Sequence, residues 1–387
     1  MIHKMKSSFL LRISLLCLGI FSFAASLDSR TYTARTKAGE YRPRFVYDVE
    51  FAMNFDNREY GDESFSPSGT IFGARLAPSV GFVKGTYNSR HRLMAGAEFM
   101  KDFGDVRADG SGLFREAFFY YGYEKLFENG TFSLTAGIFP RNRSQEKWST
   151  AFFSENYLWY NPYMEGMLMG YDWRNGHVEL GCDWIGMHGA SHDVKEQFLL
   201  FSAGHIKPVR RLKLGYSTYM MHLANSAAAP GVADNFLGEA YAEIELSGLL
   251  GLFNEFTLRA GYIQSLQRDR EASSDFETPG LGEATVRISR SGFGLTNSLY
   301  YGRDIMPLYG RSDTAGELYG GRLYLNDPFF RIRTDGSSAP GSYDRLEVFF
   351  TPQTGRSLQL KFSAVFHFNN LSYSGCQQLI TLSYNLL

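Results

Sequence analysis

Hydrophobic and polar residues alternate along much of this chain. In residues 44–55, six apolar or aromatic side chains alternate with a more polar set that includes Asp48. The same period of two recurs in 131–139, 357–368 and 377–387. Successive side chains of a β-strand point to opposite faces, whereas a helix needs a period of 3.6, so the pattern predicts strands.

The alternation repeats often enough to predict an all-β protein. Most segments have about the length of a tilted membrane-spanning strand, roughly 9–11 residues. We expect a single transmembrane antiparallel up-and-down β-barrel of about 18 strands, with 16 as the alternative. The predicted strands are 44–55, 70–83, 91–101, 113–125, 131–139, 164–173, 177–187, 197–206, 211–222, 237–247, 255–267, 282–289, 293–302, 318–325, 329–333, 342–351, 357–368 and 377–387.

The connections between these strands alternate in length. Those after odd-numbered strands are long, such as 56–69, 140–163 and 368–376, whereas the even ones are mostly short, such as 174–176. Outer-membrane barrels have short periplasmic turns and longer extracellular loops. The parity predicts the bacterial outer membrane as the location, with both termini in the periplasm.

Composition favours a membrane barrel over the alternative, a soluble secreted β-protein. Aromatic residues make up 16% of the chain, which also has 40 glycines, and no internal stretch is apolar for long enough to predict a transmembrane helix. A barrel spreads its apolar surface over alternate residues, which fits this composition.

The N-terminal 26 residues are typical of a cleavable signal peptide. Lys4, Lys6 and Arg12 precede or enter an apolar stretch, and Ala24-Ala25-Ser26 offers small residues for cleavage. We therefore expect 1–26 to be removed, 27–43 to form a short periplasmic segment and 44–387 to form the barrel. Removing three basic residues takes the formal net charge from −1 to −4. This charge gives no indication of nucleic-acid binding.

Three stretches resemble segments of porin-like outer-membrane β-barrels of Gram-negative bacteria, within a poorly characterised subgroup. They are Gly137-Ile138-Phe139-Pro140-Arg141, Asn161-Pro162-Tyr163-Met164-Glu165-Gly166 and Val365-Phe366-His367-Phe368. The resemblance covers the mature chain and implies a pore. One departure is the C-terminus Tyr384-Asn385-Leu386-Leu387, which lacks the final aromatic residue usual in such barrels.

Motifs for covalent chemistry are missing from the sequence. It contains no G-x-S-x-G, no H-E-x-x-H and no phosphate-binding loop. His188 and His192 are four residues apart, but Gly189 and Ser191 favour a loop over the helix that would align the two imidazoles. We therefore predict no catalytic site, no metal, no cofactor and no enzymatic activity.

Charged residues on the polar faces are the candidates for a pore lining, because Arg or Lys facing lipid at the midplane costs about 2–4 kcal/mol. Loop 140–163 is the third long connection and, by analogy with general porins, a candidate constriction. The pore-lining candidates are Arg44, Asp48, Glu50, Arg75, Lys213, Glu243, Glu245, Arg259, Arg287, Arg345, Glu347 and Lys361. The constriction candidates are Arg141, Arg143, Glu146, Lys147 and Trp148.

Together these features predict a porin-like channel for passive or weakly selective diffusion of small hydrophilic solutes. Its expected partners are outer-membrane lipid and those solutes, with no nucleic acid, and a homo-oligomer is compatible with the sequence. Two alternatives stay open. One is a surface adhesin or a partner in a secretion or export assembly, and the other, less favoured, is an outer-membrane enzyme.

Overall fold

A computed structural model describes residues 42–61, 66–105, 112–187, 196–224, 231–247, 251–313, 316–333, 337, 339–353, 355 and 357–386. The expected signal peptide and nearly all of the expected periplasmic segment lie outside these residues.

Sixteen strands dominate the fold, which confirms the all-β prediction. They are β1 Arg44–Tyr60, β2 Gly69–Gly85, β3 Ser89–Asp102, β4 Phe114–Phe127, β5 Gly130–Pro140, β6 Tyr163–Trp173, β7 Gly176–Gly186, β8 Gln197–Val209, β9 Leu212–Leu223, β10 Ala233–Glu245, β11 Glu255–Asp269, β12 Gly280–Arg290, β13 Phe293–Gly302, β14 Gly341–Phe350, β15 Leu358–Asn369 and β16 Ser372–Asn385.

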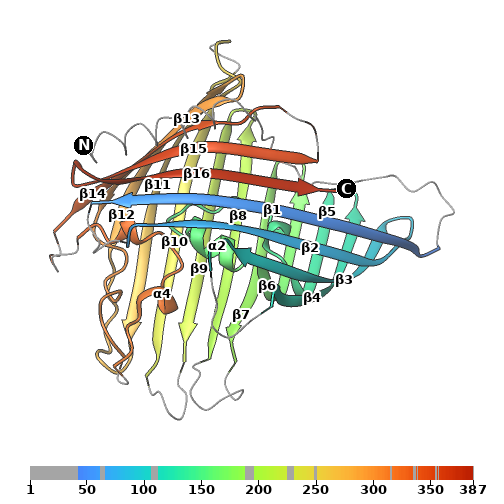
Figure 1. The fold of residues 1–387 in the computed structure, drawn as a ribbon, viewed down its shortest axis with the longest axis horizontal. Helices are drawn as coiled ribbons and strands as arrows, with labels where there is room; N and C mark the ends of the chain where they lie inside the picture. The colour runs from blue at the N-terminus through green and yellow to red at the C-terminus, as the bar shows by residue number, and fades with distance from the viewer. Residues whose placement is uncertain are drawn as a thin grey trace.

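The strands form one closed antiparallel barrel (Figure 1). Each strand pairs with its neighbours in sequence, and β1 pairs with β16 to close the ring. In that closing ladder Phe51 lies opposite Tyr384, and on its other side Phe51 lies opposite Leu76 of β2. Closure leaves no unpaired edge, which is the condition for a sheet to span a bilayer.

The strand count of 16 replaces our first expectation of 18 and matches the alternative. The predicted strands 318–325 and 329–333 are wrong. Instead, α4 (Gly320–Leu323) and the 3-10 helix η2 (Pro328–Phe330) lie in the long connection between β13 and β14. Leu323, Phe329 and Phe330 are fully buried. This segment is apolar because it is enclosed within the barrel, and the pattern of a buried segment resembles that of a strand.

Aromatic and aliphatic side chains cover the outside of the wall. Phe45, Tyr47, Leu93, Phe119 and Tyr262 all point away from the barrel and are exposed. Soluble proteins rarely expose so continuous an apolar surface, so this exterior is suited to lipid. Among the described residues, no helix is long and apolar enough to cross a membrane.

The two ends of the barrel differ in their connections. At one end, here the long-loop rim, the connections that follow β1, β3 and β5 are long. The other end, the short-turn rim, carries turns such as 128–129. The expected long connection 368–376 is wrong, because β15 and β16 extend further and leave only Asn370 and Leu371 between them. The other connections alternate between long and short as predicted.

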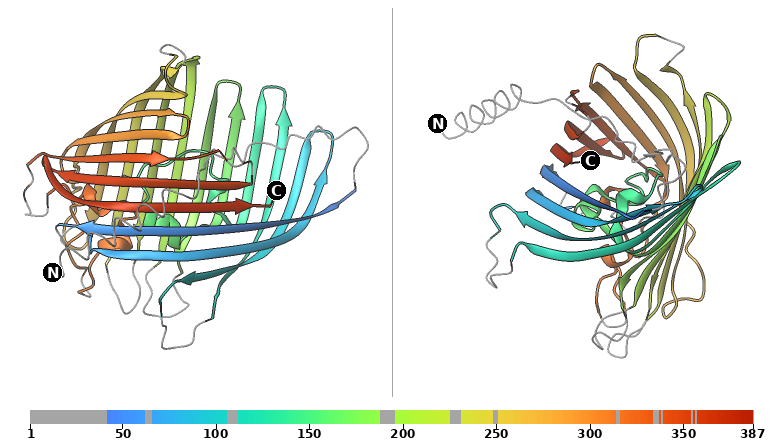
Figure 2. Two further views of the ribbon diagram at one scale, coloured as in Figure 1. Left: turned by 45° about the horizontal axis from the view of Figure 1, so that its top comes forward. Right: turned by 90° about the vertical axis from the view of Figure 1, so that its right-hand side faces the viewer.

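Two connections fold back into the lumen and fill it near the long-loop rim. We call residues 141–162, 303–313 and 316–333 the plug. It contains the 3-10 helix η1 (Arg141–Arg143) and α2 (Glu155–Tyr160), and α2 lies within the ring of strands (Figure 2). Phe152, Leu323 and Phe330 of the plug join Tyr219 and Tyr343 of the wall in one hydrophobic core. The barrel therefore has a packed half and, toward the short-turn rim, a polar half.

Candidate functional site

The twelve predicted pore-lining residues lie on the lumen face of their strands, as the strand registers show. Most of them pair with an opposite charge. Arg75 lies 3.8 Å from Glu50, and Arg345 lies 3.3 Å from Glu347, which also contacts Lys361. These charges compensate one another across neighbouring strands, and their role in solute passage remains a prediction.

Several lumen carboxylates were not singled out in the sequence. Glu98, Glu239 and Glu283 are buried, and Arg259 contacts both Glu239 and Glu283, the latter at 3.5 Å. Their alternation with apolar residues was the available signal, but their strands also carry polar residues at exposed ends.

The five predicted constriction residues all lie inside the barrel. Arg141 pairs with Asp183, and Arg143 donates to the Tyr120 hydroxyl at 2.6 Å. Lys147 lines an interior cavity, as do Glu146 and Trp148. Their capacity to limit passage remains a prediction.

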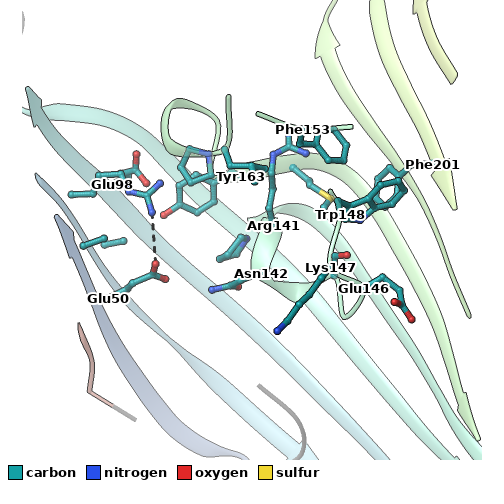
Figure 3. Close-up of a pocket in the computed structure, with 18 residues that line it drawn as sticks. Glu50, Glu98, Arg141, Asn142, Glu146, Lys147, Trp148, Phe153, Tyr163 and Phe201 are labelled. Atoms are coloured by element: carbon teal, nitrogen blue, oxygen red, sulfur yellow. Dashed lines mark ion pairs between the residues drawn. The ribbon is translucent and has the colours of Figure 1, made fainter. Parts of the chain in front are cut away.

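Loop 141–162 covers an interior cavity of about 510 Å³ (Figure 3). Glu50 and Glu98 lie on one side of it, whereas Trp148, Phe153 and Phe201 form an aromatic wall on the other. The Trp148 ring packs edge-on against both phenylalanines, with centroids 5.3 Å and 5.8 Å away. The cavity thus joins a charged side to an apolar side.

A hydrogen-bonded network borders this cavity. Ser144 donates to Glu179, and His177 contacts Asp172 through Nδ1 at 2.9 Å and Glu179 through Nε2 at 3.3 Å. Both ring nitrogens of His177 are therefore occupied. Beside them, burial would raise the pKa of Glu146, but the hydrogen bond to His205 and the Lys213 ammonium 3.6 Å away hold that pKa below its usual value.

A second cluster lies on the outside of the wall, at the long-loop rim. Cross-strand partners at one height form what we call the rim row: Trp184 on β7, Phe198 on β8, His222 on β9, Asp234 on β10 and Arg268 on β11. These five strands lie side by side in Figure 1.

The neighbours of the rim row in sequence show which way it faces. Met221 and Asn235 are fully buried, and the Asn235 amide donates to the Leu323 carbonyl within the plug. Because alternate residues of a strand point to opposite sides, His222 and Asp234 point outward. Trp184, also outward, is 41% exposed.

The polar part of the rim row is an aspartate–histidine pair flanked by arginines. His222 Nδ1 lies 3.0 Å from Asp234 Oδ1. The other carboxylate oxygen, Oδ2, accepts from Arg270 Nε at 2.8 Å and lies 3.4 Å from Arg268. The His222 ring packs against Phe198, with centroids 4.9 Å apart, and its Nε2 has no hydrogen-bond partner among the described residues.

This arrangement has the elements of general-base chemistry. The aspartate fixes the imidazole tautomer by accepting from Nδ1, which leaves the lone pair of Nε2 to take a proton. Little in the sequence indicates this pair, because His222 and Asp234 stand on different strands and meet only through strand pairing. Within the described ranges, no group of three or more His, Cys, Asp or Glu side chains is arranged to hold a metal ion. His188 and His192 lie outside those ranges.

Comparison with known protein families shows to which family the chain belongs. A family model described as lipid A 3'-O-deacylase-type matches residues 42–334. The chain belongs to this family. The expectation that the protein is not an enzyme is therefore wrong, because the family is named for an enzyme. That expectation rested on linear motifs, which cannot register residues that meet through strand pairing. No match was found among curated proteins.

Solved outer-membrane barrels share the architecture. A loop L8 deletion mutant of OmpT from Vibrio cholerae is 11% identical, with a TM-score of 0.52, over 89% of this chain and 99% of that chain. OprD from Pseudomonas aeruginosa (10% identity, TM-score 0.46) aligns over 88% of this chain and 95% of its own. OccAB3 from Acinetobacter baumannii (10%, 0.44) aligns over 88% and 99%. The expected resemblance to porin-like outer-membrane barrels is confirmed at the level of the fold.

Proposed function

We propose that this protein is an outer-membrane ester hydrolase that removes an acyl chain from an outer-leaflet lipid of the lipid A class, with His222 as general base. The observation that carries the proposal is the outward-facing His222–Asp234 pair at the long-loop rim. We place that rim at the cell exterior and both termini in the periplasm, because long loops are extracellular in such barrels. The family affiliation supports the reaction class.

The proposed chemistry uses a water molecule as nucleophile. With Nδ1–H donating to Asp234, His222 Nε2 takes a proton from water as the water oxygen attacks the ester carbonyl. The tetrahedral intermediate collapses by breaking the bond to the sugar oxygen, which leaves as an alcohol with the proton held on Nε2. Arg268 and Arg270 contact Asp234, and their positive charge beside the pair would stabilise a developing negative charge. A fatty acid and a deacylated lipid result.

The surroundings of the pair suit a lipid substrate. Trp184 and Phe198 stack with centroids 5.3 Å apart, as expected of an aromatic girdle at the membrane interface. Toward the bilayer, Met220 and Tyr216 follow His222 on the same outward face of β9. An acyl chain lying along this face would leave its ester at the height of His222.

The test is hydrolysis of purified lipid A by the refolded mature chain in detergent, with products identified by mass spectrometry. We expect loss of one acyl chain, slowed about 10²–10⁴-fold in His222→Ala. His91→Ala is the matched control, because His91 also lies on the outer wall but contacts the Tyr121 hydroxyl, at 2.6 Å, near the short-turn rim. Equal activity in wild type and His222→Ala would contradict the proposal.

The charged lumen favours a second candidate function, diffusion of small hydrophilic solutes. The half of the barrel toward the short-turn rim contains the interior cavity of about 510 Å³ and is lined by ion-paired side chains. The test is single-channel conductance in a planar bilayer. Ohmic current that changes when Arg141 and Arg143 are replaced by Gln would support passage past loop 141–162. A folded barrel without current would exclude it.

A further inference from the structure

The interior cavity beneath loop 141–162 carries charged groups that the proposed hydrolysis does not use. Apolar side chains such as Ala52, Ala77, Leu158 and Met164 form much of its lining. Its volume of about 510 Å³ lies within the range of pockets that enclose small molecules, roughly 300–1,000 Å³. Such pockets are usually apolar with a few polar groups that orient the ligand, so the polar groups of this cavity indicate what it can hold.

Glu50 of β1 presents a hydrogen-bond acceptor to the cavity. Its side chain is 30% exposed, although it lies on the lumen face of the wall. Within the described part of the chain its one ion contact is Arg75 at 3.8 Å, which is too long for a hydrogen bond. Arg75 is held elsewhere, because its Nη1 donates to the Trp159 carbonyl at 3.2 Å and its guanidinium lies over the Trp159 ring. The Glu50 carboxylate can therefore accept hydrogen bonds from a bound ammonium group.

Lys147 presents hydrogen-bond donors to the same cavity. Its side chain is exposed, and among the described residues it has no ion pair and no hydrogen bond. The neighbouring charged groups are already paired, because Arg141 contacts Asp183 and Glu146 contacts His205. The Lys147 ammonium is therefore available to bind a carboxylate.

An aromatic surface faces the two charged groups. The Trp148 ring packs edge-on against three phenylalanine rings, with centroids 5.3 to 5.8 Å away, and these contacts fix the plane of the indole. In Figure 3 Glu50 and the aromatic side chains stand on opposite sides of the cavity, with Lys147 between them. An apolar body can therefore lie against Trp148 while charged groups reach Glu50 and Lys147.

We propose that the interior cavity binds a small zwitterion, in which an ammonium and a carboxylate group are attached to an apolar body. Glu50 binds the ammonium, Lys147 binds the carboxylate, and the body packs against Trp148. The proposal goes beyond the hydrolytic function, because the cavity shares no residue with the rim row and needs no ester. Binding at this site also does not require that a solute cross the barrel.

The probes are L-phenylalanine, phenylethylamine and phenylpropionate, titrated calorimetrically into the mature chain in phosphatidylcholine nanodiscs. They share an aromatic body and differ in charge, because L-phenylalanine carries both charged groups, phenylethylamine only the ammonium and phenylpropionate only the carboxylate. We expect saturable binding of L-phenylalanine. Each of the other two should bind about ten-fold more weakly, because each lacks one hydrogen-bonded charge pair.

Two variants assign the charged contacts. Glu50→Gln should weaken L-phenylalanine and phenylethylamine about ten-fold and leave phenylpropionate unchanged. Lys147→Gln should weaken L-phenylalanine and phenylpropionate to a similar degree and leave phenylethylamine unchanged. Trp148→Leu should weaken all three probes, because each places its ring against the indole. The controls Glu243→Gln on β10 and Lys207→Gln on β8 remove the same charges from outside the cavity lining and should bind as wild type does.

Absence of saturable L-phenylalanine binding to the folded wild-type barrel would overturn the proposal. Wild-type affinity in both Glu50→Gln and Lys147→Gln would overturn it as well. An equal loss of all three probes in either variant would do the same, because it would mean that the side chain supports the cavity without contacting the ligand. None of these results depends on whether lipid A is hydrolysed or current flows, so failure of this proposal is distinguishable from failure of the proposed function.

Discussion

The rim row and the interior cavity both bring together a histidine, a carboxylate and a cation, yet their histidines differ. His177 in the lumen is bonded through both ring nitrogens, to Asp172 and Glu179. His222 on the rim is bonded through Nδ1 alone among the described residues. A histidine can act as a base only through a nitrogen whose lone pair is available, so proximity to a carboxylate is not sufficient.

The largest expected effect is a difference in lipid A hydrolysis between variants of the rim row and variants of the interior cavity. His222→Ala should slow lipid A hydrolysis by about 10²–10⁴-fold, because it removes the general base. Ser144→Ala and His177→Gln in the lumen should leave the rate within two-fold of wild type. The measurement is acyl release followed by mass spectrometry. Loss of activity in Ser144→Ala with normal activity in His222→Ala would move the reaction into the cavity.

A second effect separates the lumen from the outer rim by stability. Arg345 is buried and lies 3.1 Å from Glu155 of the plug and 3.3 Å from Glu347. Arg345→Met should destabilise the barrel by about 1.5–3 kcal/mol, because buried Glu347 loses a charged hydrogen-bond donor and keeps only Lys361. Arg270→Gln on the exposed rim should cost less than about 1 kcal/mol. Guanidinium unfolding in lipid vesicles measures both, and similar costs would mean that the lumen pair is solvated.

The plug offers a smaller test of how firmly the lumen is filled. Ser154 caps α2, its hydroxyl accepting the Tyr157 backbone N–H at 3.1 Å. Ser154→Ala should lower the free energy of unfolding by about 1 kcal/mol, the usual value of such a cap. Hydrolysis at the rim should not change. Equal unfolding midpoints for Ser154→Ala and wild type would indicate that α2 is held by its packing alone.

Much of the wall could be predicted from the sequence, because the period of two is a local property of each strand. The alternation in 44–55 identified β1 and its apolar outer face, although the strand continues to Tyr60. The same logic failed for 318–333. There the apolar residues fill the inside of the barrel, and a segment that is buried on all sides carries no period that distinguishes it from a strand.

The sequence by itself therefore determined the all-β class, the outward apolar face and the alternating connection lengths, since each depends on neighbouring residues. Only the tertiary structure decided that 141–162, 303–313 and 316–333 enter the lumen and that His222 meets Asp234 on the outer rim. These features arise from contacts between residues that are distant in sequence or on paired strands. Strand register and loop packing set such contacts, and neither is fixed by any local pattern.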